Sequence, residues 1–224
     1  MTKKYELVCF DLDGTLIEEE SGDVLWQRMA HIVHDSKEIN KERSKLYKEG
    51  KLSINDWTNM DLSDWKDYGV TKEFLITQAT HSKLIPGVKK TLLELKKSDV
   101  KIAIISGSIN ILLDTVFPDH PFDDVFINQL FFDEEGKLSH WEIGESGKTD
   151  KGRILEKIAK RENIPLEKTV FVGDHLNDIP AAKIAGLAVA FNSKCDELKE
   201  HCDVIIDKKD MALLLPHLLD YHHF

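Results

Sequence analysis

The apolar run Leu7-Val-Cys-Phe10 is followed at once by the polar stretch Asp11-Leu-Asp-Gly-Thr15. A short apolar run of this kind is typical of a buried strand, and the polar residues after it predict a loop at its carboxyl end. In sheets of parallel strands, ligands bind beyond the carboxyl ends of the strands. Asp11 and Asp13 are therefore the first candidate site residues.

Beyond this strand the sequence changes character twice. Residues 18–84 are rich in charge, contain three of the four tryptophans and place apolar residues at helical spacing. We see no strand pattern in them. From Pro86-Gly87 onward, strands alternate with helices; the expected strands are 101–105, 169–172, 187–191 and 204–206, and an expected hairpin joins 125–132 to 138–143.

This alternation predicts an α/β fold with a Rossmann-like core, in which helices cover both faces of a largely parallel central sheet. The helical stretch interrupts the sheet after its first strand and is expected to form a small cap domain. We assign residues 1–17 and 85–224 to the core and residues 18–84 to the helical cap. Two more expected strands end in polar groups, at Ser106-Gly107 and at Asp174 to Asp178.

The residues at these strand ends suit the hydrolysis of a phosphate monoester. That reaction needs an oxygen that attacks in line, a proton for the leaving group and compensation of the negative charge on the phosphate. Asp11 is ionised near neutral pH and is the expected nucleophile, which would form an aspartyl-phosphate. Asp13 is the expected acid and base. Ser106 and the amide of Gly107 are expected to bind phosphate oxygens where a strand meets a helix.

Several carboxylates around a phosphate would repel it unless a cation lies between them, and a ligand set made only of oxygens suits Mg²⁺. We expect Asp11, Asp174 and the backbone carbonyl of Asp13 to bind this ion, while Asp178 orients a water molecule bound to it. Asn177 lies between the two acids and is expected to support the metal or the phosphate. A lysine should balance the remaining negative charge.

The composition excludes several other classes of protein. The formal net charge is −10 and no block of lysine or arginine occurs, which argues against a nucleic-acid partner. No apolar run approaches the roughly 20 residues that span a bilayer, and residues 1–6 lack the apolar core of a signal peptide. The three cysteines follow no disulfide or zinc pattern, so we expect a reduced, cytoplasmic protein.

Together, these stretches resemble the motifs of the haloacid dehalogenase superfamily of phosphohydrolases. Asp11-Leu-Asp-Gly-Thr-Leu16 is similar to the nucleophile motif, Ile104-Ile-Ser-Gly107 to the second motif, and Gly173-Asp-His-Leu-Asn-Asp178 to the acidic metal motif. All three occur in the required order at the ends of expected strands, which makes the resemblance specific. The presence of Asp13 favours the phosphatases of this superfamily over its dehalogenases.

Within the superfamily, the chain looks most like the phosphoserine phosphatase branch, over nearly its whole length and most densely in residues 151–191. The resemblance implies that Lys151, which precedes a glycine at an expected helix start, is the lysine that keeps the nucleophile ionised, in preference to Lys148. It also implies that Glu20 meets a substrate amine, although Glu20 belongs to a run of three glutamates that is typical of a solvated face. His175 would either approach the substrate or lie in an exposed loop.

The cap sequence departs from that branch where the substrate would bind. An arginine of the cap should hold the substrate carboxylate, but its expected position falls near Asp61, and no arginine lies between Arg43 and Arg153. Because an aspartate would repel a carboxylate, the substrate stays open, with phosphoserine as one candidate. Three tryptophans would either line a pocket for a less polar substrate or form the core of the cap: Trp26, Trp57 and Trp65.

The sequence therefore leaves three hypotheses for the function. The first is hydrolysis of a small phosphorylated metabolite, the second is phosphoryl transfer or a mutase reaction in the same superfamily, and the third is a binding role without catalysis. Cap closure and water exclusion decide whether water is the acceptor, and neither is readable from sequence. A nucleophile together with an acid/base argues against pure binding. The oligomeric state is not predicted.

Overall fold

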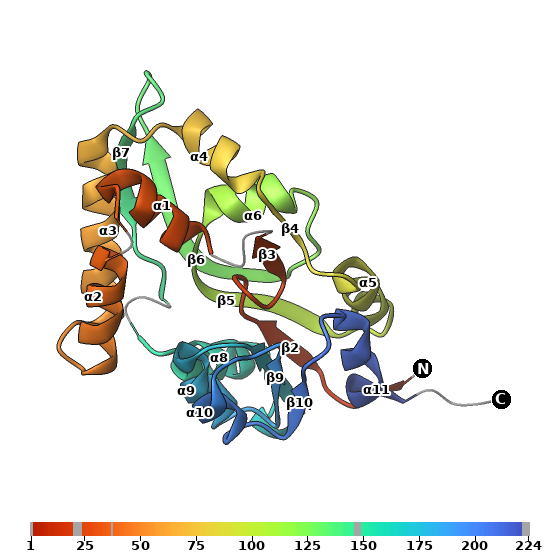
Figure 1. The fold of residues 1–224 in the computed structure, drawn as a ribbon. Helices are drawn as coiled ribbons and strands as arrows, with labels where there is room; N and C mark the ends of the chain where they lie inside the picture. The colour runs from red at the N-terminus through yellow and green to blue at the C-terminus, as the bar shows by residue number, and fades with distance from the viewer. Residues whose placement is uncertain (1, 20–23, 37, 146–148, 221–224) are drawn as a thin grey trace.

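A seven-stranded sheet forms the centre of the molecule in the computed structural model, which describes residues 2–19, 24–36, 38–145 and 149–220. The strand order is β10-β9-β8-β2-β5-β6-β7, and all neighbours are parallel except β6 and β7 (Figure 1). In chain order these strands are β2 (Leu7–Phe10), β5 (Lys101–Ile109), β6 (Asp124–Phe132), β7 (Leu138–Glu142), β8 (Thr169–Gly173), β9 (Leu187–Phe191) and β10 (Val204–Ile206).

Strand β2 is central because both of its faces are covered. Its side chains alternate between the faces, as in any strand: Leu7 and Cys9 join the apolar cluster under α8, whereas Val8 and Phe10 join the cluster under α5. The last residue of β2 pairs in register with residues of β5 and β8. Polar groups that follow these three strands therefore meet at one edge of the sheet.

Helices cover both faces, which confirms the predicted α/β fold class. One face carries α8 (Lys151–Arg161), α9 (Ile179–Ala182) and α10 (Asp196–Lys199), and the other carries α5 (Val88–Lys97), α6 (Asn110–Val116) and α11 (Leu215–Leu218). Three short 3₁₀ helices complete this part: η1 (Leu166–Lys168), η2 (Leu176–Asp178) and η3 (Met211–Leu214). Across the described ranges, every helix is too short or too polar to cross a membrane.

A helical segment is inserted between β2 and α5, as predicted. Its members, which we call the cap helices, are α1 (Leu25–His34), α2 (Glu38–Lys48), α3 (Ile54–Tyr68) and α4 (Lys72–Ala79), drawn in orange and yellow in Figure 1. Helix α3 begins after Ser53, whose hydroxyl accepts a hydrogen bond of 3.0 Å from the N–H of Asp56. It ends at Gly69, which adopts the left-handed conformation (φ 85°) that favours glycine. Trp65 is buried in the core beneath these helices.

Two short strands join the cap helices to the rest of the chain, although the sequence predicted no strand there. β3 (Ile17–Glu19) pairs antiparallel with β4 (Ser82–Leu84). Each has three residues with mixed polarity, so neither carries the apolar run that marks a strand. Strand β5 is also longer than predicted, because after an irregularity in its pairing it continues past Ser106 to Ile109. At the chain ends, β1 (Thr2–Lys3) pairs with β11 (Leu219–Asp220).

Candidate active site

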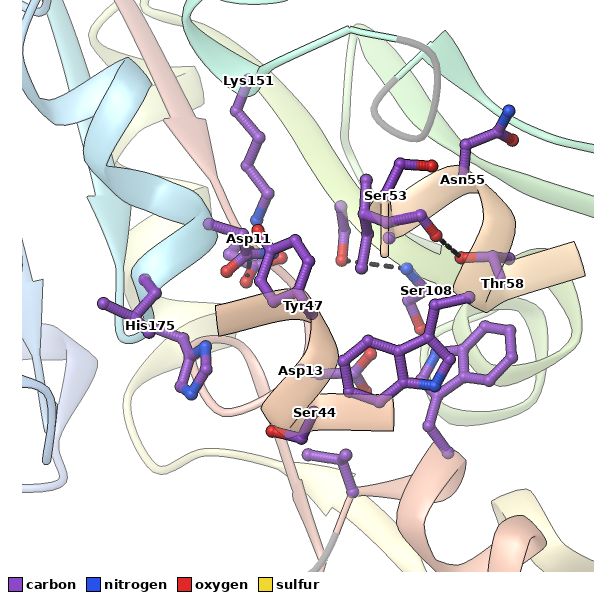
Figure 2. Close-up of a pocket in the computed structure, with 18 of the residues that line it drawn as sticks. Asp11, Asp13, Ser44, Tyr47, Ser53, Asn55, Thr58, Ser108, Lys151 and His175 are labelled. Carbon is purple, nitrogen blue, oxygen red and sulfur yellow. Dashed lines mark hydrogen bonds and ion pairs between the residues drawn. The ribbon is translucent and has the colours of Figure 1, made fainter. Parts of the chain in front are cut away.

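One cavity of about 670 Å³ brings together the polar residues at the carboxyl ends of β2, β5 and β8 (Figure 2). Side chains from α2 and α3 close it from the other side. The predicted residues that line it are Asp11, Asp13, Ser106, Gly107, Lys151, Asp174 and Asn177. Asp178 lies fully buried next to them. Glu20 and Lys148 lie outside the described residues.

Lys151 lies at the centre of the strand-end residues, which we call the sheet side of the cavity; the residues of the cap helices form its cap side. Its ammonium nitrogen lies 3.0 Å from Oδ2 of Asp11 and 2.6 Å from Oδ1 of Asp178, and only 3% of the residue is exposed. It is the first residue of α8, where Asp150 accepts a hydrogen bond from the N–H of Arg153 and caps the helix. Burial alone would lower the pKa of Lys151, but the negative charges of Asp11 and Asp178 outweigh it and raise that pKa. The ammonium group therefore stays charged in the interior.

Three carboxylates surround this lysine closely enough to share a cation. Asp11, Asp174 and Asp178 each place one oxygen so that all three oxygens lie within 4.8 Å of one another. The pKa of Asp174 is raised well above its ordinary value, first by burial and then by the charges of Asp11 and Asp178. One lysine does not balance three acids, and carboxylate oxygens are the ligands that hard divalent cations prefer. The donor set thus fits such an ion.

Asp178 holds the loop after β8 in place. Its Oδ2 accepts hydrogen bonds from the N–H groups of Asp174 (2.9 Å) and His175 (3.0 Å). A Cβ atom at Gly173 would collide with this carboxylate, which explains the glycine. Gly14 plays a matching part on the opposite loop, because it has a φ of 81° and a Cβ atom there would collide with Asp174.

Asp13 is an acid of the site whose pKa lies near neutral pH. Burial first, and then the charge of Asp11, raise the pKa of Asp13 to about 7. This carboxyl group can therefore give or take a proton near neutral pH. A group that both gives and takes a proton works best when its pKa lies near the working pH.

The second motif lies against the carboxylates from the neighbouring strand. Ser106 is buried, and its hydroxyl oxygen accepts a 3.2 Å hydrogen bond from the N–H of Ser108. The amide of Asn128 donates to the carbonyl of Gly107 at 2.7 Å, which fixes the backbone there. Helix α6 begins at Asn110, three residues beyond Gly107. A strand-to-helix junction is therefore present here, with Ser106 and Gly107 still within β5.

A sequence model of the haloacid dehalogenase-like hydrolases matches residues 5–186. The chain belongs to this family.

Several relatives of this hydrolase are named phosphoserine phosphatases. It is 38% identical to phosphoserine phosphatase of Methanocaldococcus jannaschii, over 97% of this chain and 100% of the relative. It is 30% identical to phosphoserine phosphatase of Archaeoglobus fulgidus, over 94% of this chain and 59% of the relative. A solved substrate-bound phosphoserine phosphatase complex superposes with a TM-score of 0.80 at 33% identity, over 97% of this chain and 100% of the other.

A solved phospho-aspartyl intermediate analogue of phosphoserine phosphatase matches with a TM-score of 0.77 at 32% identity, over 97% and 100% of the two chains. These findings confirm the predicted family, fold class and assignment of the hydrolase as a phosphatase. The named relatives are phosphatases, which favours hydrolysis over the phosphotransferase and binding alternatives.

An arginine lies next to the cap side of the cavity, in a pairing that the sequence did not predict. Arg43 of α2 forms an ion pair with Asp61 of α3, and its Nη2 lies 2.6 Å from Oδ2 of Asp64. Asp61 is only 6% exposed and lines the cavity. Burial raises the pKa of Asp61 to about 6, against the opposing effect of Arg43. An arginine is therefore present beside the expected position, but it comes from an earlier helix and is held by two acids.

The tryptophans of the cap divide between the two roles that the sequence left open. Trp26 and Trp57 line the cavity, whereas Trp65 is buried in the core with its ring centroid 4.8 Å from that of Trp26. His175 also lines the cavity, but it is an exposed residue of the loop after β8, and partial removal of its ring from water lowers its pKa. Tyr47 was not singled out in the sequence, yet it projects from α2 toward Asp11 in Figure 2.

Proposed function

We propose that this phosphatase hydrolyses a small phosphorylated metabolite with the help of Mg²⁺, passing the phosphoryl group through Asp11. The observation that carries the proposal is the contact of Lys151 with both Asp11 and Asp178, which are buried and form a group of three carboxylates with Asp174 at the strand ends. A cation that touches the nucleophile keeps it ionised. Neighbouring acids without further function would repel one another at a cost to the fold.

Asp11 and Asp13 divide the chemistry. In the first step, an oxygen of Asp11 forms a bond to phosphorus while the bond from phosphorus to the leaving oxygen breaks, and Asp13 gives that oxygen its proton. In the second step, Asp13 takes a proton from water, the water oxygen bonds to phosphorus, and the bond from Asp11 to phosphorus breaks. The pKa of about 7 for Asp13 supports both directions of proton transfer.

Asp11, Asp174 and the backbone carbonyl of Asp13 would hold the magnesium ion. When bound, Mg²⁺ supplies positive charge that neutralises the phosphate and orients it. Asp178 is proposed to orient a water molecule on the ion without binding the ion itself. Both of its oxygens already accept hydrogen bonds, from Lys151 and from two backbone N–H groups.

Phosphate and substrate contacts complete the proposal. Ser106, the Gly107 amide and Asn177 line the cavity beside Asp11 and would bind phosphate oxygens. Glu20 is proposed for the substrate, as the family resemblance implies. Phosphoserine is the first compound to test, since the named relatives are phosphoserine phosphatases.

Residues 18–84 are proposed to form a cap domain that admits the substrate. We also propose that the protein lies in the cytoplasm, which agrees with three free cysteines.

The test is phosphate release from a panel of phosphorylated metabolites, measured with Mg²⁺ and with a chelator. We expect activity that needs both the metal and Asp11, so that Asp11→Asn is inactive with every compound. Asp67→Asn, at an exposed position near the end of α3, serves as the matched control and should retain full activity. Undiminished release by Asp11→Asn, or by chelated protein, would refute the proposal.

A further inference from the structure

The cap side of the cavity is built from aromatic rings and one buried carboxylate. Trp26, Tyr47, Trp57 and Asp61 all line it, and the ring centroids of Tyr47 and Trp57 lie 6.0 Å apart at an angle of 53°. The two rings are therefore tilted toward each other and do not form the parallel slot that stacks a flat base. The side chain of Trp57 lies close enough to Asp61 to lower the pKa of that carboxyl group slightly, against the effect of burial.

The charge around Asp61 is negative. Arg43 contacts Asp61 and Asp64 together, so one positive charge faces two negative ones, and Arg43 itself does not line the cavity. His34 contributes charge only when protonated; its Nε2 lies 3.1 Å from Asp64. Arg43 engages one oxygen of Asp61, and an ionised carboxylate accepts several further hydrogen bonds. With a pKa of about 6, Asp61 is ionised at neutral pH.

The other cap residues on the wall do not reverse this charge. The cavity is also lined by the neutral polar residues Asn40, Ser44, Asn55 and Thr58. One lysine of the cap helices, Lys48, is among the described residues that line the cavity. It is exposed at the end of α2, and its positive charge helps to lower the pKa of His175. A substrate carboxylate placed against Asp61 would meet a like charge in a buried site.

Aromatic faces beside a carboxylate attract an organic cation. A quaternary or primary ammonium group gains from the negative faces of tryptophan and tyrosine rings, and more so when water is excluded. We propose that the preferred substrate is the phosphate monoester of an amino alcohol, whose leaving group carries a positively charged nitrogen and no carboxylate. This inference rests on the proposed function, because it places the phosphate at Asp11 and the ammonium group at Asp61.

The experiment compares kcat/KM for phosphoethanolamine, phosphocholine, phosphoserine and propyl phosphate at neutral pH with Mg²⁺. We expect one of the two amino-alcohol esters to exceed both phosphoserine and propyl phosphate by at least about tenfold. In Asp61→Asn, the ratio of kcat/KM for that ester to kcat/KM for propyl phosphate should fall by about tenfold. Asp64→Asn is the matched control, because Asp64 contacts the same arginine without lining the cavity, and this variant should keep the preference.

Equal or better hydrolysis of phosphoserine or propyl phosphate would overturn the inference, as would an Asp61→Asn enzyme that keeps the preference. Both results leave the proposed function standing. If well-folded protein hydrolyses none of the four esters and no compound of the wider metabolite panel, the proposed function fails. Calorimetric binding of phosphocholine against phosphoserine then decides the inference separately, since tighter binding of phosphoserine would refute it.

Discussion

The two sides of the cavity are built in different ways. On the sheet side, Asp11, Ser106 and Asp174 come from strands or the residues just after them, and backbone hydrogen bonds fix each one. On the cap side, Asp61 and Arg43 come from two helices and meet only through packing. The sheet side carries the three motifs on which the family resemblance rests, whereas the cap side has no arginine between Arg43 and Arg153, where the resemblance implied one. We infer that the sheet side sets the chemistry and the cap side sets the substrate.

The largest expected effect falls on the sheet side, in Asp13→Asn. Without its acid and base, kcat with an alkyl phosphate should fall by about a thousandfold. With p-nitrophenyl phosphate the leaving group needs no proton, so the first step should survive and the second should stall. Stopped-flow absorbance is then expected to record a burst of nitrophenolate followed by slow turnover. An equal rate loss with both esters and no burst would contradict the role of Asp13.

A second sheet-side prediction concerns stability. Lys151→Met removes the positive charge that contacts Asp11 and Asp178, so both buried carboxylates lose their ion pair with Lys151. Breaking a buried ion pair from one side costs about 3 kcal/mol in the free energy of unfolding. Urea denaturation measures this loss. Lys157→Met is the matched control on the same helix, because its exposed pair with Glu145 should contribute less than about 1 kcal/mol. Equal losses would show that burial of Lys151 has no energetic consequence.

Binding of Mg²⁺ at the sheet side should stabilise the protein by about as much as Lys151→Met destabilises it. Mg²⁺ at about a hundred times its dissociation constant is expected to raise the free energy of unfolding by about 2.7 kcal/mol. Asp174→Asn should abolish most of this gain, because it removes one of the three oxygens that can meet the ion. Thermal melts with Mg²⁺ and with chelator provide the measurement, and Asp67→Asn should respond like the wild type. A gain unchanged in Asp174→Asn would place the ion elsewhere.

The smallest effect belongs to the cap side and depends on pH. Burial raises the pKa of Asp61 from 3.8 to about 6, so between these values the folded chain keeps a proton that the unfolded chain has lost. The stability that Asp61 contributes is therefore greatest at low pH and falls as pH rises through 6. From about pH 4 to about pH 7, the stability difference between the wild type and Asp61→Asn should shrink by about 2 kcal/mol. A difference that grows with pH would mean that Arg43 outweighs burial.

The same contrast explains what could be predicted from sequence. Asp11 and Asp178 were predicted because each follows an expected strand, where local pattern is informative, and Lys151 was predicted from the family resemblance at an expected helix start. The contact between Arg43 and Asp61 joins residues on separate helices, and no local pattern encodes how α2 and α3 pack. Both residues were noted in the sequence, but a pairing between them was not.

Local pattern failed in the fold for related reasons. β3 and β4 have three residues each and owe their pairing to the two chain crossings between the sheet and the cap helices, not to an apolar run. The role of each tryptophan was also undecided, because helical spacing does not reveal which side of α1 or α3 faces the cavity. Trp57 and Trp65 lie on the same helix, yet only Trp57 lines the cavity.

Trapping the phosphorylated enzyme tests the central claim most directly. The protein is mixed with p-nitrophenyl phosphate and Mg²⁺, quenched in acid during turnover, digested and examined by mass spectrometry. We expect one phosphoryl group on Asp11, more of it in Asp13→Asn, and none in Asp11→Asn. Steady turnover with no phosphoryl group on Asp11, or with the group on another residue, would contradict the account.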